Sequence, residues 1–258
     1  MWIGTNNGLN RFDGYVFDVF KHDMRDTGGL PNNNVSGPHL DTAGYMWLGG
    51  QYQFSQLEPQ TGKIRRINLY DDQTGLPLNG YRYQSLMIDD KGTVWTSTGK
   101  TLIEVTYYDP LHPDSVACKQ HSHLPGDSSL SFEAFFPSFN DSKERMWLGG
   151  NRGAMVWDRK LGKGLHIPLG DVGLQGGVRG GVRRFAEDRQ GKIWMASYGG
   201  LCSITIDEEL DRYHTQMEWD LFPVDGSPFE NAYEYVYTDK NGWTVVDKEC
   251  LNPLANSQ

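Results

Sequence analysis

The sequence predicts an all-β fold, a β-propeller of four-stranded blades, and two observations support this prediction. The first is a tryptophan in a short apolar run that recurs about every 48 residues, a period typical of stacked supersecondary units. The second is composition, because 31 glycines and 12% aromatic residues suit short strands joined by tight turns. The recurring positions are Trp2, Trp47, Trp95, Trp147, Trp194 and Trp243. We therefore expect five to six repeats of about 48 residues within residues 1–246, followed by an irregular tail at 247–258.

The repeat is clearest in residues 33–54, NNVSGPHLDTAGYMWLGGQYQF. An extended run leads to Asp41, a turn ends at Gly44, and a strand follows around Trp47. Aspartate at the head of such a turn caps its own backbone, and glycine supplies the left-handed residue. Third and fourth strands complete each unit, and we expect the tryptophans to pack between blades. The same D-x-x-G-x-x-W pattern recurs from Asp89 and from Asp188.

Three units depart from this pattern. The turn that begins at Asp141, before Trp147, lacks the glycine, and the last unit places Asp239 only four residues before Trp243. The first unit begins MWIGTNNGLNRFDG, which is predicted to be a second and a third strand without a first. One interpretation is an incomplete product of a longer gene, truncated at both ends. The alternative is a closed five-bladed ring, in which a strand at 231–237 pairs with the Trp2 strand and removes an exposed sheet edge.

Composition excludes several functional classes. The net charge of −9 disfavours nucleic acid and anionic membrane surfaces as partners, and no apolar run reaches the ~20 residues of a membrane span. We expect no membrane contact within this chain, and no signal peptide is recognised. Cys118, Cys202 and Cys250 lack the spacing of a disulfide framework or a zinc site and are interpreted as ordinary thiols. No cofactor is expected.

Motifs that suggest catalysis are weak. His121-Ser-His123 is interpreted as a solvated loop without a third metal ligand. The glycine-rich run 173–184 lacks the Lys-Ser/Thr of a phosphate-binding loop, and we interpret it as a loop between blades. Residues 196–199 do not form a nucleophile elbow, because Met195 stands where the first glycine is needed. We predict no catalytic residue and no metal ligand.

The repeat resembles the two-component regulator propeller repeat family. The resemblance is carried by residues 1–14, by Leu30-Pro-Asn-Asn-Asn-Val35 ahead of Asp41 and Trp47, and by residues 188–204. It implies a sensor, usually a seven-bladed propeller in the extracytoplasmic part of a membrane-bound signalling protein. Here it would be an incomplete seven-bladed propeller in a periplasmic location. The implied partners are a small-molecule or carbohydrate ligand, the remainder of the propeller, and downstream domains such as a histidine kinase or a diguanylate cyclase.

A ligand site is expected where turns between second and third strands meet the loops between blades. Aromatic rings, amides and cations at these turns suit a sugar through stacking and hydrogen bonds. The candidate ligand-binding residues are Asn7, Tyr52, Gln53, Arg82, Lys100, Arg152, Arg179 and Tyr198.

Two other functions remain open. One is an enzyme similar to the propeller-fold streptogramin lyases, or a hydrolase, which would need His22 or His39 close to a carboxylate at the ring centre, together with a divalent metal. The other is a scaffold whose face binds another protein. The sequence therefore favours a non-catalytic sensor without excluding these alternatives.

Overall fold

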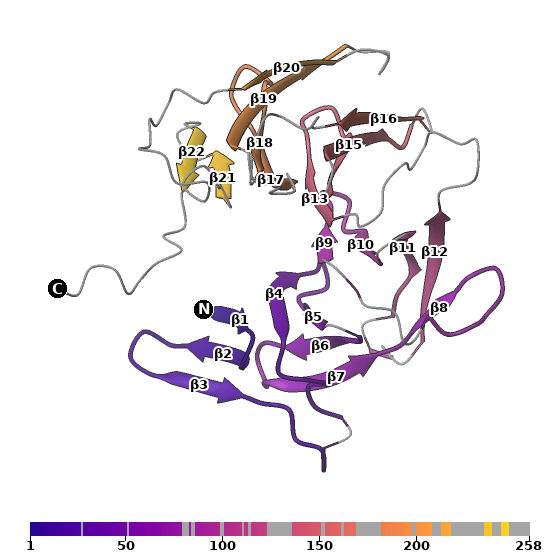
Figure 1. Ribbon diagram of the computed structural model, residues 1–258. Coiled ribbons are helices and arrows are strands. Elements are labelled where there is room, and N and C mark those ends of the chain that lie inside the picture. The colour runs from indigo at the N-terminus through magenta and orange to yellow at the C-terminus, as the bar shows by residue number, and fades with distance from the viewer. Residues whose placement is uncertain are drawn as a thin grey trace, which may run out of the picture. The chain divides into compact units, whose positions relative to one another are not determined.

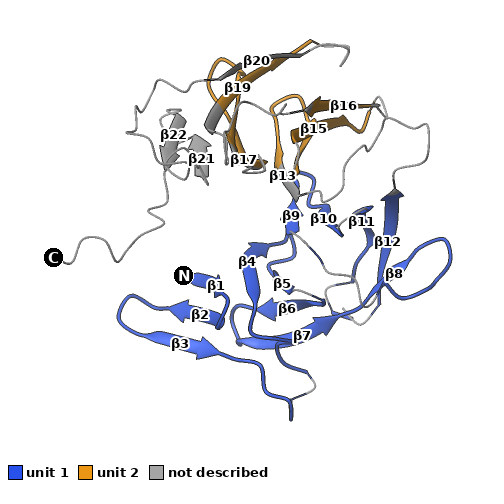
Figure 2. Cartoon of the chain, in the orientation of Figure 1, with its two compact units in different colours: residues 1–122, 134–137 blue, residues 123–133, 138–258 orange. Residues whose placement is uncertain are grey.

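The computed structural model describes most of the chain. The described residues are 1–26, 28–50, 52–78, 83, 86–98, 101–109, 111–112, 115–122, 136–150, 153–160, 163–168, 182–197, 200–207, 213–217, 235–238 and 244–247. They form strands and turns, and none of them belongs to a helix that could cross a membrane. The chain divides into two compact units (Figure 2). Unit 1 comprises Met1–Ser122 and Ala134–Pro137, and unit 2 comprises His123–Glu133 and Ser138–Gln258.

Unit 1 contains three sheets (Figure 1). The first is the antiparallel sheet β1(Trp2–Thr5), β2(Gly8–Phe12) and β3(Phe17–Phe20). The second is β4(Val35–Leu40), β5(Met46–Gly50), β6(Phe54–Glu58) and β7(Lys63–Ile67), paired in chain order. The third has the order β8-β12-β11-β10-β9, formed by β8(Leu69–Asp71), β9(Leu86–Ile88), β10(Val94–Ser97), β11(Thr101–Tyr107) and β12(Val116–Ser122). Three consecutive strand pairs of this sheet are antiparallel, but β8 lies parallel to β12 at its outer edge.

Unit 2 contains two four-stranded sheets and one strand pair, all paired in chain order. The first sheet is β13(Phe136–Asn140), whose first two residues belong to unit 1, β14(Met146–Gly150), β15(Gly153–Asp158) and β16(Lys163–Pro168). The second sheet is β17(Val182–Glu187), β18(Ile193–Ser197), β19(Gly200–Ile206) and β20(Tyr213–Met217). The pair is β21(Tyr235–Thr238) and β22(Thr244–Asp247).

The strand order confirms the predicted all-β architecture of separate, mainly antiparallel sheets. Trp47, Trp147 and Trp194 each lie on the second strand of their sheet, and Trp95 lies on β10, beside the edge strand β9. Trp2 lies on β1 of a sheet with only three described strands, as the opening sequence indicates. The number of blades and the closure of a ring stay predictions. Tyr235–Thr238 pairs with Thr244–Asp247, and Trp243 lies outside the described residues.

The predicted aspartate turns are present, and each has a second function. In every case one carboxylate oxygen accepts backbone N–H groups two and four residues later, at 2.8–3.0 Å. The other carboxylate oxygen accepts the indole N–H of the tryptophan six residues later. These Oδ2···Nε1 distances are 3.2 Å for Asp41–Trp47, 3.0 Å for Asp89–Trp95, 3.0 Å for Asp141–Trp147 and 2.8 Å for Asp188–Trp194. The repeated motif therefore fixes the turn and the tryptophan with one side chain.

Within each unit, neighbouring sheets approach through their first or second strands. In unit 1, β1 lies against β4 and β4 against β9, while in unit 2, β14 lies against β17 and β17 against β21. Small residues after the tryptophan allow this approach. A Cβ atom on Gly4 would lie 2.5 Å from the carbonyl oxygen of Val35, and one on Gly149 would lie 2.6 Å from that of Val182.

Each unit has its own apolar core. In unit 1, one core cluster gathers around Leu9, Leu48 and Leu57, and another contains Trp47 and Cys118. In unit 2, Trp147 packs against Phe185, with ring centroids 5.5 Å apart. Burial of large aromatic and aliphatic side chains is the main favourable contribution to such a fold.

Candidate functional site

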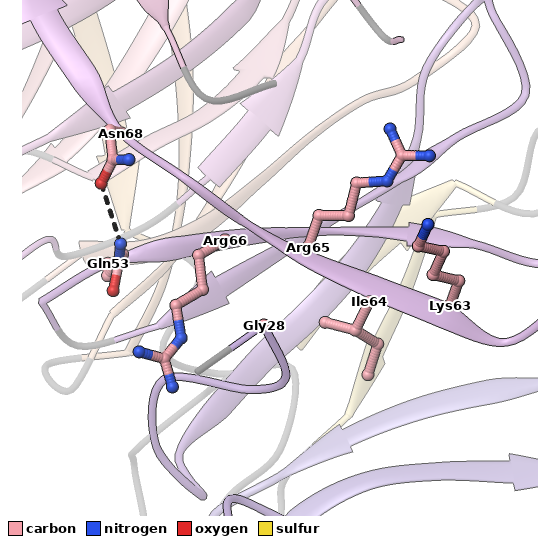
Figure 3. A pocket seen from close by; sticks show the side chains of 7 residues that line it. All are labelled: Gly28, Gln53, Lys63, Ile64, Arg65, Arg66 and Asn68. Carbon is pink, nitrogen blue, oxygen red and sulfur yellow. Dashed lines mark hydrogen bonds between the residues drawn. The ribbon is translucent and has the colours of Figure 1, made fainter. Parts of the chain in front are cut away.

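Unit 1 carries an open depression with a volume of about 450 Å³. It lies beside β7, the outer strand of the second sheet (Figure 3). Three cations, two amides, one isoleucine and one glycine form its lining: Gly28, Gln53, Lys63, Ile64, Arg65, Arg66 and Asn68. Five of the seven lining residues therefore carry side chains that can bind charged or hydroxylated groups.

The arginines extend to different sides of β7. Successive side chains on a strand point to opposite faces, which places Ile64 with Arg66 and Lys63 with Arg65. Figure 3 shows the guanidinium groups of Arg65 and Arg66 far from each other. Ile64 packs against the Leu9 core and anchors that face of the strand. The two arginines therefore do not converge on a single ligand atom.

Main-chain carbonyl groups hold Arg66 in position. Its Nε donates to the carbonyl oxygen of Gly29 at 3.1 Å, and its Nη2 donates to that of Asp26 at 3.2 Å. Arg65 is tied elsewhere, because its Nη1 donates to the carbonyl oxygen of Leu111 at 3.0 Å. Both arginines thus connect loops to β7.

The cations of the depression have no carboxylate partner in the described part of the chain. The ion pairs found there involve other residues, such as Arg11 with Asp18 and Arg145 with Asp141. A chain of net charge −9 therefore exposes a local cationic surface at β7. Such a surface attracts anionic groups, and Arg66 offers a planar guanidinium to a carboxylate.

Gln53 lies where the turn between β5 and β6 meets the depression. Its Nε2 donates to Oδ1 of Asn68 at 3.0 Å. This hydrogen bond fixes the orientation of the Gln53 side-chain amide and therefore of its carbonyl oxygen. The preceding Tyr52 is 53% exposed. An exposed ring next to an oriented amide suits a sugar face and its hydroxyl groups.

The structure places two of the predicted ligand-binding residues, Tyr52 and Gln53, side by side, and only Gln53 lines the depression. Asn7 is exposed in the turn between β1 and β2, where its backbone N–H donates to Oγ1 of Thr5 at 3.1 Å. It is not among the lining residues. Arg82, Lys100, Arg152, Arg179 and Tyr198 lie outside the described residues.

Sequence analysis missed most of the cationic lining. Lys63, Arg65 and Arg66 follow one another in the run KIRRI, and a strand with three cations and apolar residues between them is a recognisable edge-strand pattern. The sequence does not show that this strand borders a depression. The carbonyl groups that orient Arg66 belong to a loop about forty residues earlier in the chain.

The prediction that His121 lies in a solvated loop is wrong. His121 lies on β12, and its Nε2 is 2.8 Å from Oε2 of Glu104 on β11. The side chains are 15% and 28% exposed, and the His121 ring lies 5.9 Å from that of Trp95. Strand pairing with β11 overrides the proline-bounded context that suggested a loop. His123 lies outside the described residues.

His22 faces main-chain and amide groups. Its Nδ1 is 2.7 Å from the carbonyl oxygen of Leu30, and its backbone N–H donates to Oδ1 of Asn33 at 2.8 Å. His39 lies on β4, opposite Trp47 in the register. In the described part of the chain, no three His, Cys, Asp or Glu side chains gather as a metal ion would require.

Comparison with known proteins gives a fold likeness. No protein-family model matches the chain, and no curated protein matches it. Among solved structures, the extracellular domain of the hybrid two-component system BT3049 from B. thetaiotaomicron is similar. Its TM-score is 0.65 at 14% identity, over 95% of this chain and 30% of that one.

Two further structures are similar. PorZ, a surface component of the type-IX secretion system of Porphyromonas gingivalis, has a TM-score of 0.66 at 13% identity, over 95% of this chain and 35% of PorZ. An inactive variant of virginiamycin B lyase from Staphylococcus aureus, solved with quinupristin, has a TM-score of 0.59 at 10% identity. That match covers 97% of this chain and 81% of the lyase.

These likenesses establish the fold. Extracellular domains of two-component systems are structural neighbours of this chain, as the repeat resemblance predicts. The chain spans about a third of their length, 30% of one and 32% of another. The neighbours include both extracellular domains of two-component systems and an enzyme, so the fold likeness is shared by both classes.

Proposed function

We propose that this chain is the ligand-sensing propeller region of a membrane-bound, two-component-type signalling protein, situated outside the cytoplasm and without catalysis of its own. The observation that carries the proposal is the likeness to the extracellular domain of a hybrid two-component system, which extends over 95% of the chain. The repeat resemblance points to the same class. Signal output would come from other domains of the signalling protein.

The ligand under this proposal is a small molecule or an oligosaccharide. Tyr52 offers an exposed ring, Gln53 an oriented amide and Arg66 a guanidinium held by carbonyl groups. A ring that stacks on a sugar, an amide that binds hydroxyl groups and a cation for a uronate carboxylate form a coherent set. The ligand would be a carbohydrate that carries carboxylates.

The test is a binding assay with uronate-containing and neutral oligosaccharides of matched length. We expect a measurable affinity for the acidic series, which falls roughly tenfold in the double variant Tyr52→Ala/Gln53→Ala, as the loss of a stacking contact and a hydrogen bond predicts. Tyr15→Ala, an exposed aromatic residue between β2 and β3 that does not line the depression, is the matched control and should bind like the unchanged protein. An affinity unaffected by the double variant would contradict the site.

A second candidate is a lyase or hydrolase on the same fold, favoured by the likeness to virginiamycin B lyase and by the His121–Glu104 pair. A histidine hydrogen-bonded to a carboxylate is a common acid–base arrangement. Mass spectrometry of the oligosaccharides after incubation separates the two proposals. A sensor returns them unchanged, whereas an enzyme yields products that disappear in His121→Ala.

A further inference from the structure

Ser55, on β6, carries a buried hydroxyl group that has no hydrogen-bond partner among the described residues. The residue is only 1% exposed. Buried polar groups are normally paired, because an unpaired one costs free energy in the folded protein. An alanine would fill the same position at almost the same volume without that cost. Departures of this kind gather at functional sites, so Ser55 is expected to bind a group from outside the described residues.

Strand pairing places Ser55 on the face of the sheet that borders the depression. Ser55 lies opposite Arg66 of β7 and opposite Leu48 of β5. Residues directly opposite each other in an antiparallel pair have their side chains on the same face. Arg66 lines the depression, and Leu48 belongs to the Leu9 core cluster. Ser55 therefore lies between an apolar core and a cation of the ligand site.

A narrow hollow adjoins both Ser55 and the depression. Ser55 and Leu48 line it on the side of the sheet, and Leu30 and Pro31 line it from the loop that precedes β4. Gln53 lines both the hollow and the depression, so the two share a wall. The hollow is too narrow to admit a water molecule, and a ligand group reaches Ser55 only if part of the lining moves.

Gln53 is the part of this lining that can move at small cost. The loop wall is fixed, because Leu30 is buried and its carbonyl oxygen lies 2.7 Å from Nδ1 of His22. The Gln53 side chain is instead held by its amide hydrogen bond to Asn68, which also lines the depression (Figure 3). A ligand hydroxyl can replace that bond, since exchange of one hydrogen bond for another changes the free energy little. Rotation of Gln53 about its side-chain bonds would then open the hollow towards the depression.

We propose that Ser55 is the innermost hydrogen-bonding residue of the ligand site and binds a hydroxyl group of the carbohydrate, which enters past Gln53. This role rests on the proposed function and adds a requirement for one specific hydroxyl group. In the bound state, Oγ of Ser55 gains the hydrogen bond that the described residues do not offer. Arg66, directly opposite Ser55 on the neighbouring strand, lies close enough to bind the carboxylate of the same sugar. Ser55 thus selects for a hydroxyl group, whereas Arg66 selects for the carboxylate.

The test is a titration of galacturonate and glucuronate trimers, and of their monodeoxy analogues, by isothermal titration calorimetry. Ser55→Ala should weaken the binding of the tighter trimer about tenfold, as loss of a hydrogen bond predicts. One monodeoxy analogue should lose a similar factor against the unchanged protein and should bind Ser55→Ala as well as the trimer does, because the two losses concern the same bond. Ser203→Ala, which replaces an equally buried serine on β19, is the matched control and should bind like the unchanged protein.

Urea denaturation of the ligand-free protein gives a second readout. Ser55→Ala should leave the free energy of unfolding unchanged or raise it, because the hydroxyl has no partner to lose among the described residues. A lower free energy of unfolding would overturn the proposal, since Ser55 would then be bonded within the protein.

The outcomes distinguish this role of Ser55 from the proposed function. Binding that depends on Tyr52 and Gln53 but not on Ser55 overturns the role of Ser55 alone. Equal penalties for each monodeoxy analogue in both proteins also overturn it, because Ser55 then contacts no ligand hydroxyl. If neither trimer binds the unchanged protein, the proposed function and the role of Ser55 are both overturned.

Discussion

Four aspartates, Asp41, Asp89, Asp141 and Asp188, each fix a turn and a tryptophan with one carboxylate. The first three are buried, so these hydrogen bonds form where competition from water is low. Removal of the carboxylate would leave an indole N–H and two backbone N–H groups without their acceptor. This explains why aspartate and tryptophan keep their spacing of six residues in four repeats while the intervening residues vary.

The turn after Asp141 keeps this geometry without its glycine, and it does so at a cost. Glu144 has a φ of 63°, in the left-handed region that Gly44, Gly92 and Gly191 occupy in the other turns. Glu144→Gly should stabilise the protein by about 0.5–1 kcal/mol, since relief of left-handed strain exceeds the extra entropy of glycine in the unfolded chain. The exposed Lys160–Glu144 ion pair, at 3.3 Å, contributes little. Urea denaturation of the variant measures the change.

Gly44→Ala is the matched reverse substitution. Gly44 has a φ of 85°, and a Cβ atom there would meet no heavy atom within 4 Å, so the substitution adds left-handed strain without a steric clash. It should destabilise the protein by about 1 kcal/mol. If Glu144→Gly leaves the free energy of unfolding unchanged while Gly44→Ala lowers it, Glu144 is not strained.

At the scale of elements, β8 adds a fifth strand to the third sheet and ties it to the chain that leaves β7. Its last residue, Asp71, accepts from Nε2 of Gln120 on β12 at 2.8 Å, and from the hydroxyl and backbone N–H of Thr74 at 2.7 and 2.8 Å. These donors, with Gln120 the largest contributor, lower the pKa of the Asp71 carboxyl to about 2. The ionised carboxylate therefore helps to hold β8 against β12.

This contact predicts a specific pH dependence. An aspartate has a pKa of about 3.9 in an unfolded chain. The Asp71 carboxyl therefore binds a proton more weakly in the folded protein than in the unfolded chain. Its contribution to stability is complete above about pH 4 and is lost as the pH falls through about 2. The difference in Tm between the unchanged protein and Asp71→Asn should thus narrow as the pH falls from 4 to 2, in calorimetric scans. Gln120→Ala should reproduce part of this effect, and a constant difference would contradict it.

The elements also show what the sequence could predict. The spacing of the tryptophans and the Asp-x-x-Gly turns are local features of the sequence. They correctly located the strands that carry the tryptophans. β8 was not predicted, because three residues carry no period, and a parallel partner about fifty positions away decides their strand state. The depression was predicted only at Gln53. Its cations line it because a loop that begins near Asp26 supplies carbonyl groups to Arg66.

At the scale of the whole molecule, the described part of each compact unit contains one buried thiol. Cys118 lies in a core cluster of unit 1 and Cys202 in the core cluster of unit 2, both fully buried. Burial raises the pKa of the Cys118 thiol to about 12, so the reactive thiolate is scarce while the core is closed. Reaction of each thiol therefore reports the opening of its own unit.

We predict that the two thiols become reactive at different denaturant concentrations, because each depends on a different apolar core. The experiment labels a Cys250→Ser variant with a brief pulse of alkylating reagent across a urea series and quantifies each peptide by mass spectrometry. Cys118→Ser and Cys202→Ser, each in that background, identify the signals. Two separate midpoints would show that the units unfold as separate cooperative bodies. A single shared midpoint would contradict the prediction, because both cores would then open over the same range of urea concentration.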